Sequence, residues 1–421
     1  MKGYSFMEFN SSMTTETILS KKSNIGNGLA FATLLVLVLS QNKDWGSIGL
    51  LWWGSVGLFL VTYFFSGNMK ILLDEKYTLW IGSFVGLCFI SILWAVRTTL
   101  VVESMKSMVV HVAITFLLRG RIRNNEDLKK IIKVIIISIV INSVYLLITN
   151  KGMYAAQPGF DDKTVRLGTE GDWNANGIGS LTSTAMVLSL YFFKEENSKF
   201  RKCMYVAVVV LTVLVTLMTG SRTALIKVFT GVSCFLFLSS KGKRLPMTII
   251  ILFILVMMYY LVMKVPFFYS IVGWRMEGLT NLFTGGGHVD HSAQIRNQFI
   301  YDAIAQWKKE PILGYGIDCY RVVNTVKANY YSHNNFVEIL ADLGLIGFFV
   351  YYGGFFYCFK KLLSLRKNDN LKWLFTSLLI IIMISDYGSV SYNSLLNHVS
   401  IMLMFAYVFI NKKNRYKQTN M

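Results

Sequence analysis

Apolar runs of membrane-spanning length follow one another along most of this chain. Because a bilayer-spanning helix needs roughly 20 mostly apolar residues, we predict about twelve transmembrane helices in an all-α, polytopic membrane protein. The fourth run is the most polar, since Glu103, Lys106 and His111 interrupt it. Two stretches, near 150–172 and 266–335, are too long and too polar to be simple connections. The predicted spans are residues 25–41, 45–65, 77–96, 100–118, 131–149, 173–193, 203–220, 222–239, 246–265, 336–358, 372–388 and 394–410.

The composition supports a membrane protein and excludes other classes. Charged residues make up 15% of the chain and hydrophobic residues 54%, whereas a soluble domain carries about 25% charged residues. The apolar content also excludes a disordered chain. The net charge of +19 does not indicate a nucleic-acid partner, because the basic residues lie in short clusters between apolar runs. The five cysteines form no disulfide or thiolate metal pattern.

The basic clusters also predict an orientation. If the N-terminus is cytoplasmic, nearly all clusters fall on the inner side, and the short outer loops hold only Lys43, Arg97 and Arg222. Both termini are then cytoplasmic, and both long loops lie outside. The predicted parts are residues 1–265, with helices one to nine and the loop near 150–172; residues 266–335, an extracytoplasmic loop domain; and residues 336–421, with the last three helices and a basic tail.

The large outer loop contains one clear helix signal, at residues 292–309. Arg296 falls in the middle of its apolar face, where a guanidinium must snorkel, pair with an anion or point into a cavity. A salt bridge with Asp290 or Asp302 is the alternative to a functional role. The apolar face comprises Ile295, Phe299, Ile300, Ala303, Ile304 and Trp307.

Two further arginines are predicted near the outer membrane boundary. Arg222 joins two apolar runs with almost no loop, and ionisable residues at such depth are functional candidates. The alternative is a snorkelling arginine at a helix end. Arg166 opens a polar, glycine-rich stretch before a span, where Asp172, Asn174 or Asn176 could cap the next helix.

His333 stands immediately before a predicted helix start. Asn335 and Glu338 resemble a capping box in which Asn replaces the usual Ser or Thr. A histidine at a helix N-terminus on the outer face would meet an anionic substrate, and a neutral imidazole could take a proton from a hydroxyl. The alternative is that the segment is only a helix start and His333 is incidental.

The outer arginines point to a diphosphate ligand rather than to a metal site. Guanidinium groups bind diphosphate in a bidentate way, and positive charge can stabilise its departure without a metal. His288, Asp290 and His291 have metal-ligand side chains, but their spacing is not a zinc pattern. We therefore predict no metal and no cofactor.

A longer motif begins at His333. His333-Asn334 is followed after nine residues by Gly344-Leu345-Ile346-Gly347, a pattern of the O-antigen ligase and Wzy-type polysaccharide polymerase superfamily, which this sequence resembles over roughly residues 160–350. In that family the two glycines would allow close helix packing. Other segments similar to family motifs are Gly220–Ala224, the Arg296 helix with Pro311–Gly316 after it and, more loosely, Arg166–Asn176.

The resemblance implies a GT-C-like fold and an inverting, metal-independent glycosyltransferase at the outer face of the bacterial plasma membrane. The donor would be a sugar chain on undecaprenyl diphosphate. By position, the implied catalytic residues are His333 and Arg222, and His333 would activate or orient the acceptor hydroxyl. The implied substrate-binding residues are Arg166, Arg296, Asn334 and Glu338, of which the last two have supporting roles.

Three functions stay open on these grounds. We favour a polymerase of O-antigen or capsule, whose acceptor is a second lipid-linked repeat unit and whose partners would include a flippase and a chain-length regulator. A ligase would instead transfer the chain to lipid A core or another cell-surface acceptor. A transporter of lipid-linked sugars suits twelve spans, but it predicts two related halves, and none is visible here.

Overall fold

The computed structural model describes residue 57 and residues 76–149, 166–168, 174–287, 289–365 and 369–419. Across these ranges the chain is helical and contains no β-strand. The first two predicted spans lie outside the described residues. The long helices are α3 (Lys76–Ile90), α4 (Thr98–Arg121), α5 (Asn125–Thr149), α7 (Ala175–Glu195), α8 (Lys199–Met218), α9 (Arg222–Leu238), α10 (Arg244–Lys264), α15 (Asn335–Ser364), α16 (Asn370–Gly388) and α17 (Leu395–Thr419).

Each of the other ten predicted spans coincides with one of these helices. Eight helices in the described part of the chain are long and apolar enough to cross a membrane. The two outside this set are α7 and α9, because α7 is rich in Ser, Thr and Gly and α9 has 17 residues with two cations, Arg222 and Lys227. The polytopic architecture is therefore confirmed, while the number twelve stays a prediction.

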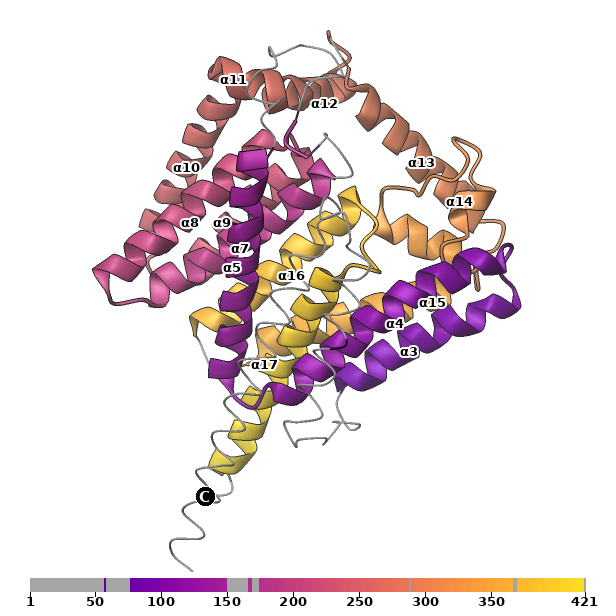
Figure 1. Ribbon diagram of the computed structural model, residues 1–421, viewed down its shortest axis with the longest axis horizontal. Coiled ribbons are helices and arrows are strands. Elements are labelled where there is room, and N and C mark those ends of the chain that lie inside the picture. The colour runs from indigo at the N-terminus through magenta and orange to yellow at the C-terminus, as the bar shows by residue number, and fades with distance from the viewer. Residues whose placement is uncertain are drawn as a thin grey trace, which may run out of the picture.

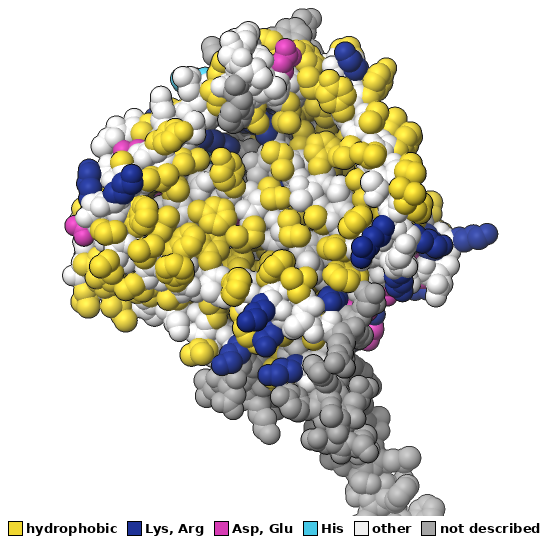
Figure 2. Space-filling view, turned by 180° about the vertical axis from the view of Figure 1, so that it is seen from behind, with side chains coloured by type: hydrophobic (Ala, Val, Ile, Leu, Met, Phe, Trp, Pro, Cys, Tyr) yellow, Lys and Arg dark blue, Asp and Glu magenta, His cyan; other side chains and the backbone are white. Residues whose placement is uncertain are grey.

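The helices pack around α16 and α17 (Figure 1). Helices α7, α8 and α9 pack together on one side of this pair, and α3, α4 and α15 on the other. Helix α10 presents Leu252, Phe253 and Val256 outward. Figure 2 shows apolar side chains spread over much of one face, with lysines and arginines at its margins. Such an apolar surface does not suit water, so the protein is a multi-pass membrane protein.

The large loop folds into further helices at one end of the bundle. They are α11 (Pro266–Phe268), the π-helix η2 (Tyr269–Gly273), α12 (Trp274–Thr284), α13 (His291–Trp307) and α14 (Tyr320–Val323). Helix α13 is the helix predicted at 292–309, and its buried Phe299 and Ala303 pack against Tyr320 and Ala341. Helix α12 was not predicted. In Figure 1, α11 and α12 lie across the end of the bundle, and α13 descends towards α14 and α15.

A break in α15 anchors the turn that follows α13. Gly344 has φ 61° and ψ −163°, a conformation open essentially only to glycine. Just N-terminal to Leu343, which precedes this glycine, the carbonyls of Ala341 and Asp342 accept hydrogen bonds from the amides of Tyr315 (3.0 Å) and Gly316 (2.8 Å). The Pro-x-x-Gly-x-Gly turn therefore docks onto the kink of α15.

This geometry corrects the expectation that both motif glycines serve helix–helix packing. A Cβ on Gly344 would lie 2.2 Å from the carbonyl oxygen of Ile312, so its close neighbour is the turn. A Cβ on Gly347 would meet Leu343 of the same helix at 2.1 Å. Glycine is required at residue 344 because of contacts with the loop, and at residue 347 because of contacts within α15. The spacing of residues along the chain does not reveal these contacts.

We expect Gly344→Ala to destabilise the protein by about 2 kcal/mol or more, since it adds a disfavoured backbone conformation to a backbone clash. Thermal unfolding in detergent would measure the loss. Gly353→Ala is the matched control, because Gly353 lies in the same helix and a Cβ added there would have no heavy atom within 4 Å. Equal melting temperatures for the two variants would contradict this account of the kink.

Candidate functional site

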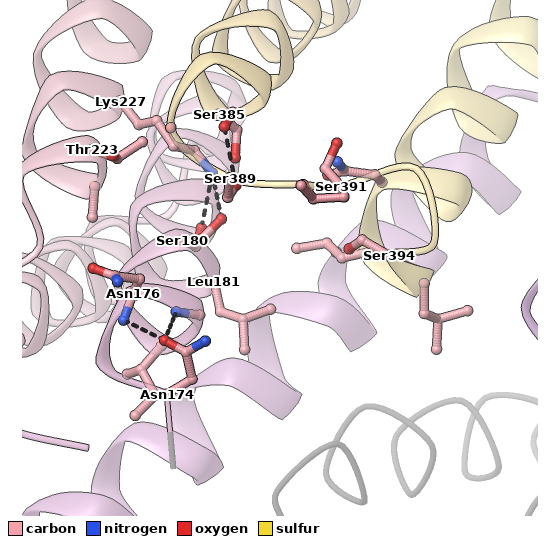
Figure 3. A pocket seen from close by; sticks show the side chains of 18 of the residues that line it. Asn174, Asn176, Ser180, Leu181, Thr223, Lys227, Ser385, Ser389, Ser391 and Ser394 are labelled. Carbon is pink, nitrogen blue, oxygen red and sulfur yellow. Dashed lines mark hydrogen bonds between the residues drawn. The ribbon is translucent and has the colours of Figure 1, made fainter. Parts of the chain in front are cut away.

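A cavity of about 350 Å³ lies between α4, α5, α7, α9, α16 and α17, and the loop domain closes part of it. Arg296, Tyr331 and His333 contribute its loop-domain wall. In the membrane helices, Lys227 Nζ donates to Ser180 Oγ (2.6 Å), and Figure 3 shows this pair between α9 and α7, with serines of the α16–α17 connection nearby. Lys227 thus faces the bundle interior. The cavity therefore combines polar and cationic groups with apolar side chains.

His333 lies in the cavity wall, one residue before the helix cap. Its backbone adopts φ 58°, uncommon for a residue other than glycine, and its ring centroid lies 4.3 Å from that of Tyr331. Burial, and then the charge of Arg296, lower the pKa of His333 to about 4. The imidazole is thus neutral near pH 7 and can accept a hydrogen bond from a hydroxyl.

The start of α15 differs in register from the predicted capping box. The N-cap is Asn334, not Asn335, and its side-chain oxygen accepts bonds from two first-turn amides at 3.0 and 3.2 Å. Glu338 accepts a bond from the amide of Ser332 (2.6 Å) instead of from the cap. Asn334 and Glu338 therefore hold the backbone on both sides of His333, and neither lines the cavity.

Asn335 has a different task, which sequence reasoning missed. Its side-chain oxygen accepts bonds from the amides of Ser391 (2.8 Å) and Tyr392 (2.9 Å), and its amide nitrogen donates to the hydroxyl of Tyr352 (2.9 Å). These bonds fix the α16–α17 connection, which lines the cavity. The only signal in the sequence was an Asn where a capping box prefers Ser or Thr.

Beside the cavity, arginines gather around one buried carboxylate. Arg222 Nη1 lies 3.0 Å from Asp290 Oδ2, with exposed side-chain fractions of 8% and 1%. Arg275 approaches the same oxygen at 3.8 Å, and both arginines donate to Ser292 Oγ, at 3.0 and 3.1 Å. Burial alone would raise the pKa of Asp290, but Arg222, Ser292 and Arg275 hold it below its usual value. Asp290 also caps α13 through the amide of Ala293 (2.9 Å).

Arg166 and Arg296 belong to the same electrostatic cluster. Burial, and then the charges of Arg275 and Arg222, lower the pKa of Arg166 to about 10. Burial also lowers the pKa of Arg296; Arg275 adds to this effect and the nearby Tyr331 opposes it. Two guanidinium groups thus contact Asp290, those of Arg166 and Arg296 lie within electrostatic range of it, and the excess positive charge suits a multivalent anion.

The predicted alternative for Arg296, a salt bridge with Asp290 or Asp302, is not what the structure contains. Asp290 pairs with other arginines, and Asp302 accepts bonds from the hydroxyls of Tyr320 (3.0 Å) and Thr325 (2.6 Å). Packing of α13 against the loop occupies both carboxylates. Among the described residues, Arg296 therefore makes no salt bridge, and it faces the cavity.

The structure thus brings the predicted residues to one end of the bundle in different roles. Arg296 and His333 line the cavity, and Arg222 directly precedes the lining residue Thr223. Arg275 was missed, because it lies in α12, which no apolar periodicity revealed. Its Nε is buried without a hydrogen-bond partner among the described residues, and its side chain does not line the cavity.

The histidine-rich sequence beside this cluster does not form a metal centre in the part of the chain that the structure describes. No three His, Cys, Asp or Glu side chains converge there as metal ligands, and His288 lies outside that part. Asp290 is instead engaged by two arginines. The metal-free site stays a prediction.

At one end of an apolar helical bundle, a cationic cluster lies beside a cavity, and this arrangement suits an anionic ligand. Residues 207–352, from α8 into α15, match the family model described as O-antigen ligase, Wzy_C. This match supports the O-antigen ligase/Wzy superfamily that the motifs predicted, and that family implies a glycosyltransferase-like ligase or polymerase activity on lipid-linked oligosaccharide. A search of curated proteins gave no match.

Proposed function

We propose that this protein is a bacterial surface-polysaccharide polymerase. It transfers a growing chain from undecaprenyl diphosphate to a lipid-linked repeat unit at the outer face of the plasma membrane. The single observation that carries the proposal is the arginine cluster around Asp290, directly beside a cavity that holds a neutral His333. A diphosphate supplies the negative charge that the cluster lacks, and the cavity accommodates the sugars.

The transfer step uses groups already in place. The acceptor hydroxyl gives its proton to His333, and its oxygen bonds to the anomeric carbon of the donor sugar with inversion. The bond from that carbon to the diphosphate oxygen breaks, and the electron pair leaves with undecaprenyl diphosphate. Arg222 and Arg296 stabilise the developing charge, so the step needs no metal.

The remaining site residues hold this arrangement. Arg166 and Arg275 bind the diphosphate together with Arg222, because their guanidinium groups share one electrostatic cluster. Asn334 and Glu338 are positioning residues, since both bond to the backbone around His333. Residues 266–335 then form an extracytoplasmic domain over the membrane helices, both termini are cytoplasmic, and a flippase and a chain-length regulator act in the same pathway.

A ligase is the second candidate, favoured by the family description that residues 207–352 match. It would use the same donor site and differ in the acceptor, lipid A core or another cell-surface anchor. A transporter of lipid-linked sugars is the distant alternative, because it gives no role to a neutral histidine beside the arginine cluster.

The test supplies the purified protein with a short undecaprenyl-diphosphate repeat unit as its only sugar substrate. A gel ladder is the expected result, since one kind of molecule then serves as donor and acceptor. Transfer only after addition of another acceptor would identify a ligase. No transfer under either condition, from protein that remains folded, would contradict glycosyl transfer and favour the transporter.

A further inference from the structure

A second cavity, of about 470 Å³, adjoins the first on the side of α4. The two cavities share the lining residues Tyr331, Val390, Asn393 and Ser394, so Tyr331 stands at their junction. The side-chain oxygen of Asn393 is buried there without a hydrogen-bond partner among the described residues. The other residues around the second cavity are Glu103, Ser104, Ser107, Asp318, Arg321 and Tyr392.

The second cavity has the opposite charge to the arginine cluster. It presents the carboxylates of Glu103 and Asp318 against one guanidinium, that of Arg321, which bonds Asp318 at 2.7 Å. Burial raises the pKa of Asp318 to about 6; Arg321 opposes this shift, and Glu103 adds to it. A diphosphate would be repelled here. Carboxylates, serine hydroxyls and tyrosines suit the hydroxyl groups of a sugar.

Asp318 is held in this wall by the fold. Its side chain is 10% exposed, and its backbone has φ 62°, rare for a residue other than glycine. Two amides, those of Asp318 and Tyr320, donate to the buried carboxylate of Asp342 at 2.8 and 2.7 Å. The backbone is thus fixed in a costly conformation that directs an acid into the cavity.

We infer that the second cavity binds the acceptor sugar of the transfer reaction, an inference that rests on the proposed function. A sugar in it lies beside Tyr331, whose ring centroid is 4.3 Å from that of His333, and can present one hydroxyl to the imidazole in the neighbouring cavity. The acidic wall selects neutral or amino sugars and disfavours uronic acids. Donor and acceptor therefore approach His333 from cavities of opposite charge.

The test separates acceptor binding from donor binding with two probes. The first is the repeat-unit oligosaccharide released from its lipid, which has no diphosphate and cannot act as donor. The second is undecaprenyl diphosphate. Binding of each to the purified protein is measured for wild type, Glu103→Gln, Asp318→Asn and the matched control Glu310→Gln, an exposed acid of the outer loop outside both cavities.

We expect Glu103→Gln and Asp318→Asn each to weaken oligosaccharide binding about tenfold, the effect of one charge-assisted hydrogen bond. Both should leave undecaprenyl diphosphate binding unchanged, and Glu310→Gln should change neither. Glu103 is exposed, so Glu103→Gln keeps the test valid if Asp318→Asn fails to fold. The inference would be overturned if the folded variants Glu103→Gln and Asp318→Asn bound the oligosaccharide as tightly as the wild type does. It would also be overturned if the wild-type protein bound undecaprenyl diphosphate but not the oligosaccharide. Wild-type protein that does not bind undecaprenyl diphosphate would overturn the proposed function instead.

Discussion

Replacing Arg222 by alanine is expected to lower the rate of sugar transfer by about a thousandfold while the protein remains in the membrane. Arg222 is 8% exposed and beside the cavity, so its guanidinium acts where water screens little. Loss of one such donor to a departing anion costs about 100- to 1,000-fold. Arg222→Lys should also lose most activity, because an ammonium keeps the charge but not the bidentate fork.

The pairing with Asp290 offers a rival explanation, in which Arg222 only neutralises a buried carboxylate. The double variant Arg222→Ala with Asp290→Asn separates the two, since it removes the unpaired charge as well. We expect the double variant, like Arg222→Ala, to remain in the membrane and to stay defective in transfer. Arg201→Lys, at an exposed arginine that pairs with Glu196, is the control that should change nothing. Recovery of transfer in the double variant would contradict a role for Arg222 in diphosphate binding.

Replacing His333 by alanine is expected to lower kcat by about 100- to 10,000-fold, the usual contribution of a general base. Binding of undecaprenyl diphosphate should be unchanged, because the arginine cluster rather than the imidazole holds the diphosphate. Single-turnover transfer and direct binding of the lipid measure the two effects separately. Equal loss of binding and transfer would show instead that His333 contributes to donor affinity.

The pH profile tests the same residue independently. The pKa of His333 is about 4, so kcat/KM should fall only as pH drops through about 4, where protonation removes the acceptor lone pair. Removing the nearby charge with Arg296→Gln should move this limb towards the ordinary pKa of about 6.5, without reaching it, because burial is the larger cause. The measurement is made in the Asp318→Asn variant, because the pKa of Asp318 is about 6 and its titration would otherwise contribute to the same pH profile. If the acidic fall in kcat/KM persisted in His333→Ala, the titrating group would be one other than His333.

Much of the fold was predictable because its causes are local. Ten long helices and helix α13 follow from apolar runs and periodicity, and those patterns arise from neighbours along the chain. Helix α12 was missed, and Arg275 with it, because its sequence has no comparable apolar stripe. The capping register was misplaced by one residue, since Asn334 and Asn335 can both cap, and contacts with the α16–α17 connection decide between them.

The sequence by itself determined the class of protein, the spacing of its spans, the predicted sides of its loops and the family motif at His333. Tertiary structure alone decided which groups meet. Arg222 and Ser292 are 70 residues apart yet hydrogen-bonded, and Glu103 and Asp318 share one cavity wall although α4 and the loop are distant in sequence. Periodicity and charge patterns predict only which helix a residue belongs to and how close it lies to the membrane boundary. The partner of a buried charge depends on how the helices and the loop pack together, because packing excludes water from that charge and brings an opposite charge next to it.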